Sequence, residues 1–246
     1  MKPTPRVLTS LLLISAFAAS ACKGIQPPPQ RPLNPPREEV SIRPGINADF
    51  LGKDVDMTRW VNTFEGETRE IATQKQAIVA SMHLRKGEDV ADVGAGTGLF
   101  LDSLAEAVGV GGKVYALDIS PEFVQHLEMR VKDEGLEQVD ARLSKERSVD
   151  LPPMSLDAAF VCDTYHHFEF PQSMLFSMYK ALRPSGKLYV VDFEKIPGES
   201  RQWVLDHVRA DKRTVTKEIE RAGFVFEEEV PIEGLAETYV LRFRRP

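Results

Sequence analysis

The chain has 246 residues, of which 42% are hydrophobic and 28% charged, the proportions of a globular protein rather than of a disordered one. Its 37 acidic residues outnumber its 31 basic ones, and this balance disfavours a broad nucleic-acid-binding surface. The two cysteines, Cys22 and Cys162, stand in different contexts, so we expect no disulfide framework, and no Cys/His spacing indicates a metal site.

Residues 1–21 have the three-part layout of a signal peptide. Lys2 and Arg6 precede an apolar run at 7–18, and small residues follow it directly before Cys22. The run is shorter than the roughly 20 residues of a comfortable membrane-spanning helix. The segment resembles a bacterial lipobox, which implies lipidation of Cys22 and a membrane-anchored or exported protein of the cell envelope. The alternatives are a plain signal peptide, or a miscalled start that would leave the protein in the cytoplasm.

A proline-rich segment follows at 22–47, and we interpret it as an extended linker because proline blocks helix and sheet hydrogen bonding. The folded domain is predicted over 48–246. Its apolar spacing predicts, in chain order, a helix over 55–82, a strand at 89–93, a helix over 97–108 and a strand at 113–120. A helix beginning at Pro121, a weak strand at 138–143, a strand at 156–163, a helix over 171–182 and a strand at 187–193 come next. Two helical pieces over 199–222 and strands at 224–230 and 238–244 complete the chain.

Strands that alternate with helices predict an α/β fold with a doubly wound, mostly parallel sheet of seven strands. The last two strands have no helix between them, so we expect them to pair as an antiparallel hairpin at one edge.

The segment "DVGAGTG" at 92–98 joins the first strand to the next predicted helix. A loop there lies beyond the carboxyl end of a strand, where open α/β sheets bind ligands, and glycine lets a ligand approach the main chain. The spacing is G-x-G-x-G, with leucine at 99, whereas a dinucleotide site needs G-x-G-x-x-G. This disfavours a nicotinamide-dependent oxidoreductase, and the lack of a following lysine disfavours a P-loop.

The segment resembles the first motif of class I S-adenosylmethionine (SAM)-dependent methyltransferases, and "CDTYHHF" at 162–168 resembles the quinone-biosynthesis subgroup of that family. The resemblance implies SAM as the cofactor and a small or lipid-like methyl acceptor. It implies that the loop binds the methionine end of SAM, that Asp118 binds the ribose, and that Glu146 lies near the adenine. The implied cofactor-binding residues are Asp92, Gly94, Ala95, Gly96, Thr97, Gly98, Asp118, Ile119, Glu146 and Asp163.

Three polar residues that follow the fourth strand are the candidates for catalysis: Asp163, His166 and His167. A histidine there could act as a base near neutral pH, or it could only cap the next helix. His207 and Arg209 are further candidates for the substrate pocket. The helix with Trp60 and Phe64 is either an ordinary amphipathic helix or a lid. We expect Asp157 to be structural and Cys162 to be a buried thiol.

The predicted function is transfer of the sulfonium methyl group of SAM by in-line displacement. The alternative is an exported protein of the same fold that binds SAM without transferring the methyl group, since SAM is made in the cytoplasm while the N-terminus predicts export.

Overall fold

The computed structural model describes residues 1, 38–52 and 55–246 of the chain. The predicted signal peptide and Cys22 therefore lie outside the described residues, as does the predicted linker up to residue 37. Within the described part, no helix is both long enough and apolar enough to cross a membrane.

Seven strands form one sheet in the order β3-β2-β1-β4-β5-β7-β6. The first five are β1 (Asp89–Val93), β2 (Lys113–Asp118), β3 (Val139–Leu143), β4 (Leu156–Cys162) and β5 (Leu182–Phe193). These pair in parallel, whereas β7 (Thr238–Arg244) pairs antiparallel with both β5 and β6 (Val225–Glu229). The predicted doubly wound sheet with an antiparallel C-terminal edge is thus confirmed. The sheet order adds that β7 inserts between β5 and β6.

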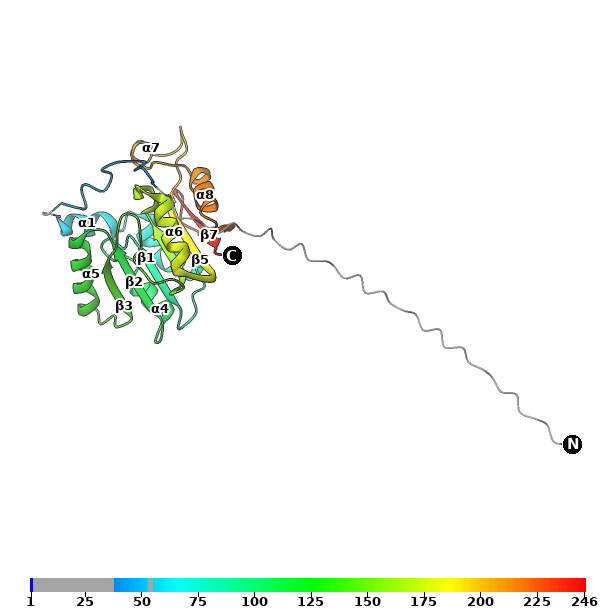
Figure 1. The fold of residues 1–246 in the computed structure, drawn as a ribbon. Helices are drawn as coiled ribbons and strands as arrows, with labels where there is room; N and C mark the ends of the chain where they lie inside the picture. The colour runs from blue at the N-terminus through cyan, green and yellow to red at the C-terminus, as the bar shows by residue number, and fades with distance from the viewer. Residues whose placement is uncertain (2–37, 53–54) are drawn as a thin grey trace. The chain divides into compact units, whose positions relative to one another are not determined.

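Helices cover both faces of this sheet (Figure 1). The N-terminal helices are α1 (Met57–Phe64), α2 (Glu70–Thr73) and α3 (Lys75–Ser81), followed by α4 (Leu101–Val108) and α5 (Pro121–Asp133). The later helices are the short 3-10 turn η1 (Tyr165–His167), α6 (Pro171–Ala181), α7 (Gln202–His207) and α8 (Lys212–Arg221). Side chains cap three of these helices at their first turn, with Asp56, Ser120 and Asp211 accepting from backbone N–H groups.

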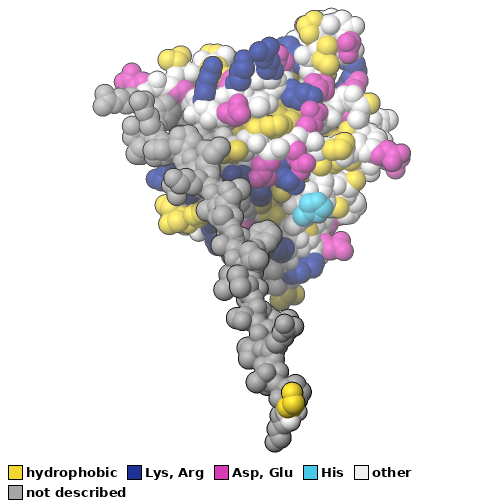
Figure 2. Space-filling model, turned by 90° about the vertical axis from the view of Figure 1, so that its right-hand side faces the viewer, with side chains coloured by type: hydrophobic (Ala, Val, Ile, Leu, Met, Phe, Trp, Pro, Cys, Tyr) yellow, Lys and Arg dark blue, Asp and Glu magenta, His cyan; other side chains and the backbone are white. Residues whose placement is uncertain are grey.

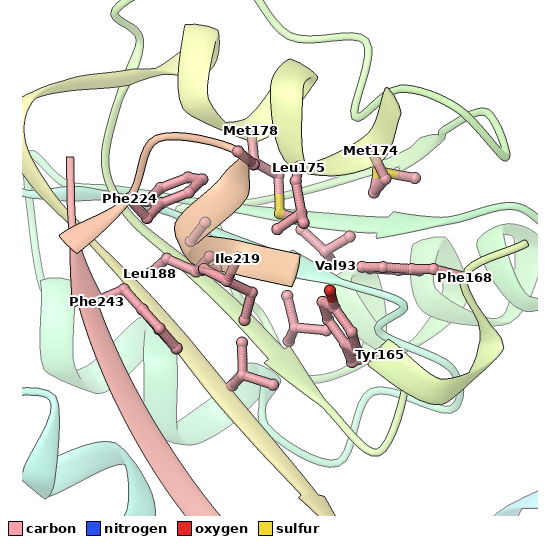
Figure 3. Packing of buried hydrophobic residues seen from close by; sticks show 14 of the residues in the cluster. Val93, Tyr165, Phe168, Met174, Leu175, Met178, Leu188, Ile219, Phe224 and Phe243 are labelled. Atoms are coloured by element: carbon pink, nitrogen blue, oxygen red, sulfur yellow. The ribbon is translucent and has the colours of Figure 1, made fainter. Parts of the chain in front are cut away.

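The core consists of two hydrophobic layers because successive strand residues point to opposite faces of the sheet. Val90 packs with α3 and α4 on one face, while its neighbour Ala91 packs with α6 and α8 on the other. Figure 3 shows the second layer, in which Met174, Leu175 and Met178 project from α6 towards the strands. Burial on both faces explains why the central strands read as continuous apolar runs.

Two predicted helix boundaries were wrong. The helix after the glycine motif begins at Leu101 rather than at Thr97, because Gly96 and Gly98 have φ angles of +54° and +92°, which no α-helix accepts. The helix predicted over 55–82 is divided into three, and the first division falls directly before Gly66. The main-chain groups at 94–98 therefore belong to a turn and not to a helix N-terminus.

Part of the predicted linker lies against the domain. The Glu39 carboxylate accepts hydrogen bonds from the first two free N–H groups of α6, those of Gln172 and Ser173, at 2.8 and 2.7 Å. Ile42 N donates to Glu169 O at 3.0 Å, and the Asn47 side chain donates to the main chain of His167 at 3.1 Å. The packed region thus begins at or before Glu39, earlier than the boundary predicted at residue 48.

Candidate functional site

A cavity of about 560 Å³ lies at the carboxyl ends of β1, β2 and β4. This is the edge of an open α/β sheet at which ligands are expected. The glycine turn and the end of β2 line one part of it, and the segment after β4 lines another. Residues from the N-terminal segment, α1 and α7 complete the walls. Residues far apart in the sequence thus line a single cavity.

The glycine turn follows β1 and is fastened to β2. Gly94 N and Ala95 N both donate to the carbonyl of Leu117, at 2.8 and 2.9 Å. Gly94 has a φ of +79°, and a Cβ atom on it would lie 2.2 Å from the Thr164 side chain. A Cβ on Gly98 would likewise crowd Leu101 at 2.8 Å. Two of the three glycines are therefore required by the protein's own packing, and the expectation that all three serve the approach of a ligand was incomplete.

Gly96 differs from the other two. A Cβ on it would meet nothing closer than the Phe64 ring at 3.6 Å, and the residue lines the cavity. Its N–H donates to Asp118 Oδ2 at 2.9 Å, while Asp118 Oδ1 accepts from Ser120 N at 2.9 Å. Burial raises the pKa of Asp118 to about 6, and the backbone N–H groups that its carboxylate accepts oppose this rise. The acid at the end of β2 is therefore held directly against the glycine turn.

Asp92 is the second carboxyl group on this part of the cavity, and it is 2% exposed. Its Oδ2 has no hydrogen-bond partner among the described residues, nor does the hydroxyl of the buried Thr97 beside it. Burial and the neighbouring charge of Asp118 raise the pKa of Asp92 to about 7. A buried, unpaired carboxylate oxygen on a cavity wall is a site for a cationic ligand group.

Asp163 ends β4 with a φ of +52°, a backbone conformation that few non-glycine residues adopt. Its carboxylate forms an ion pair with Arg69, which precedes α2. Burial raises the pKa of Asp163, although the positive charge of Arg69 opposes the rise. Arg69 belongs to the segment predicted as either an ordinary helix or a lid, and its pairing with Asp163 at the end of β4 was not predicted.

Three histidines meet beyond Asp163. His166 is 2% exposed, and its Nδ1 lies 2.7 Å from Asp192 Oδ1, at the end of β5. The Nε2 atoms of His167 and His207 are 3.2 Å apart, although 40 residues separate them in the chain. Burial opposes protonation of His166, but the charge and hydrogen bond of Asp192, together with the charge of Asp163, outweigh it and raise the pKa of His166. A histidine held by a carboxylate through one nitrogen can use the other as a proton acceptor or as a metal ligand.

Aromatic rings cover the cavity from the side of the N-terminal segment. Phe50 lies 4.8 Å from Trp60 and 5.2 Å from His167, measured between ring centroids, and Trp60 lies 5.1 Å from Phe64. Helix α1 buries none of its side chains fully, as far as the described residues show, yet Trp60 and Phe64 both line the cavity. Of the two interpretations of this segment, the covering helix is the one that the geometry favours.

The structure brings most of the predicted site residues onto this one cavity. Asp92, Gly94, Ala95, Gly96, Thr97, Asp118, Ile119, Glu146, Asp163, His166, His167 and His207 all line it. Glu146 is exposed, at the rim. Arg209 instead pairs with Glu218 at 2.7 Å, and Asp157 accepts from Asp89 N and Arg183, which is a structural role. Cys162 is buried, and burial raises its pKa well above the usual range.

Residues 91–190 match the family model of a methyltransferase domain. The matching segment is similar to methyltransferase domains, which supports the predicted methyltransferase family. It covers the glycine turn, the acid at the end of β2 and the segment after β4.

The relatives of this chain include proteins named as bacterial quinone-pathway enzymes. The chain is 31% identical over 127 residues to the ubiquinone/menaquinone biosynthesis C-methyltransferase UbiE of Methylococcus capsulatus, which is 51% of each protein. It is 30% identical over 118 residues to a demethylmenaquinone methyltransferase of Geobacillus, or 48% of this chain and 50% of that one. The chain thus spans about half the length of these curated relatives.

Solved structures share the fold. A SAM-dependent methyltransferase from Aquifex aeolicus superposes with a TM-score of 0.69 at 23% identity, covering 78% of this chain and all of that one. The [4+2]-cyclase SpnF superposes with a TM-score of 0.62 at 18% identity, covering 71% and 81%. The chain therefore shares its fold with a methyltransferase and with a [4+2]-cyclase, two enzymes of different reactions.

The cavity fits SAM on the evidence of its own residues. The cofactor carries an ammonium group, for which the unpaired Asp92 Oδ2 is a matching acceptor. It also carries two ribose hydroxyls, and Asp118 is a buried carboxylate that can accept from both. Gly96 leaves room above the main chain between the two acids. These residues would hold the cofactor, while the histidines and aromatic rings remain for a second ligand.

Proposed function

We propose that this chain is a SAM-dependent methyltransferase whose acceptor is a small, largely apolar molecule. The observation that carries the proposal is the division of the cavity. Carboxylates suited to the cofactor line the part beside the glycine turn, and aromatic rings with histidines line the part beyond β4. Two ligands of different chemistry would thus meet in one space.

The sulfonium group of SAM supplies an already activated methyl group, so the protein has to position the partners and exclude water. Asp92 and Asp118 hold the ends of the cofactor, and the glycine turn supports it between them. Phe50, Trp60 and Phe64 shield the cavity from solvent and contact an apolar acceptor. Asp163, His166 and His167 lie where the polar atom of the acceptor would be held.

The quinone-pathway names of the relatives support an aromatic, lipid-like acceptor. Figure 2 shows basic and acidic side chains interspersed on the surface. This mixture of charges gives no support to a polyanionic acceptor.

Calorimetry with SAM and with its demethylated product tests the cofactor part of the proposal. We expect saturable binding of both by the full chain. Asp118→Ala removes charge-assisted hydrogen bonds, so it should weaken binding by about 10- to 100-fold. The matched control is Asp140→Ala on the neighbouring strand β3, whose carboxylate pairs with Arg142 at 2.6 Å, outside the cavity lining. Equal affinities for the two variants, or no binding by the wild type, would contradict the proposal.

Transfer of a radiolabelled methyl group to a panel of phenols, hydroquinones and quinone precursors tests the acceptor part. The alternative, a protein that binds SAM without transferring its methyl group, rests on the export signal predicted for residues 1–21. Tight SAM binding without transfer to any acceptor in the panel would favour that alternative.

A further inference from the structure

We propose that His166, His167 and His207 form a binding site for a divalent transition-metal ion, with Zn²⁺ as the best match. One ring nitrogen from each of the three lies within 4.8 Å of the others. Two ligands on a tetrahedral zinc ion, with Zn–N distances of about 2.05 Å, are about 3.3 Å apart. The Nε2 atoms of His167 and His207 are already 3.2 Å apart. The third nitrogen, from His166, lies within 4.8 Å of both.

The surroundings of the three rings support the site. Asp192 binds Nδ1 of His166 at 2.7 Å, and a carboxylate behind a ligating histidine is the usual outer partner in zinc proteins. This hydrogen bond leaves Nε2 of His166 as the nitrogen that can bind a metal. Trp203 stacks on the His207 ring at 4.7 Å between centroids, with an angle of 16° between the planes. Two of the three rings are thus held in place by other residues.

The backbone around the histidines is fixed as well. Asn47 donates to the carbonyl of His167, and Arg43 donates to the carbonyls of Asp206 and His207. Arg43 brings a positive charge to the outer side of the cluster, and the carboxylate of Asp192 offsets it on the inner side. Because the contacts of Arg43 are to main-chain oxygens, the ring nitrogens of the histidines stay available.

All three histidines line the cavity, so an ion can enter and one coordination position remains open towards it. Three protein ligands with an open fourth position is the arrangement of catalytic zinc sites rather than structural ones. Imidazole nitrogens suit zinc, copper and nickel, whereas Mg²⁺ and Ca²⁺ prefer oxygen. At this place the ion would bind an oxygen atom of the acceptor, a role that rests on the proposed function; the metal site itself does not depend on it.

Metal binding by the full chain is measured directly. After dialysis against a chelator, titration with Zn²⁺ should give one ion per chain, and Co²⁺ should give the intense visible bands of a four-coordinate ion. His207→Ala and His167→Ala should each weaken Zn²⁺ binding by about 100-fold and abolish those bands. His83→Ala and His126→Ala are matched controls, because both residues lie outside the three-histidine group and should keep the wild-type affinity.

Thermal unfolding and calorimetry with the demethylated cofactor, on every variant, show whether each one is folded. Zn²⁺ binding that is absent in the wild type, or unchanged in folded His207→Ala, would overturn the proposal. Zn²⁺ binding without SAM binding would leave the metal site standing and refute the proposed function instead.

Discussion

Replacement of Asp92 by asparagine should have opposite effects on stability and on cofactor binding. The carboxyl group is buried, its Oδ2 has no partner among the described residues, and its pKa is raised from an ordinary value of 3.8 to about 7. Between these two pH values the folded protein binds the proton more tightly than the unfolded chain does. The free energy of unfolding therefore falls as the pH rises from about 4 to about 7.

The size of the effect follows from the shift in pKa. A difference of about three pH units corresponds to a loss of about 4 kcal/mol across this range, at 1.36 kcal/mol for each unit. Asparagine has nearly the same shape and no charge. Asp92→Asn should therefore be about 1–3 kcal/mol less stable than the wild type at pH 4, the cost of its buried amide, and about 1–3 kcal/mol more stable than the wild type at pH 8.

Urea unfolding of both proteins at pH 4, 6 and 8, without cofactor, measures this difference. At pH 8, saturating SAM should stabilise the wild type and have little effect on Asp92→Asn, because the ammonium of the ligand has lost its carboxylate. The control is Asp102→Asn, since Asp102 pairs with Lys75 at 2.8 Å and its pKa is lowered, although its burial opposes this. That variant should lose stability at pH 8. If the wild type gained stability over Asp92→Asn between pH 4 and 8, the reasoning would be refuted.

Three further outcomes are expected. Gly94→Ala should lower the free energy of unfolding by about 2–3 kcal/mol, because the left-handed backbone and a contact of 2.2 Å with Thr164 both oppose a side chain there. Gly96→Ala, whose nearest contact is at 3.6 Å, should lower it by about 1 kcal/mol. Equal losses for the two variants in urea unfolding would contradict this account of the turn. In calorimetry, SAM binding by the wild type should weaken about tenfold for each pH unit below 7, because Asp92 must lose its proton first; a flat profile between pH 5 and 7 would argue against the contact. Cells that express the full chain should incorporate labelled palmitate at Cys22 and lose the label in Cys22→Ala, and a wild type that takes up no label would remove the lipoprotein prediction.

The sequence by itself determined the local features of this protein. Short, mainly apolar runs placed the central strands, because residues buried on both faces of a sheet are mostly apolar. The motif at 92–98 predicted the ligand-binding turn and the family resemblance, because glycine adopts left-handed backbone at the lowest cost. The order of strands and helices was enough to predict the parallel sheet and its antiparallel edge.

Only the tertiary structure decided which distant residues share the cavity. The helix boundaries at Phe64 and Leu101 depended on backbone angles that the apolar pattern does not record. Arg69 reaches Asp163, and His207 reaches His167, across 94 and 40 residues of chain. No local pattern encodes such a meeting, because it results from the order in which the strands lie in the sheet and from the way the connecting segments cross its edge.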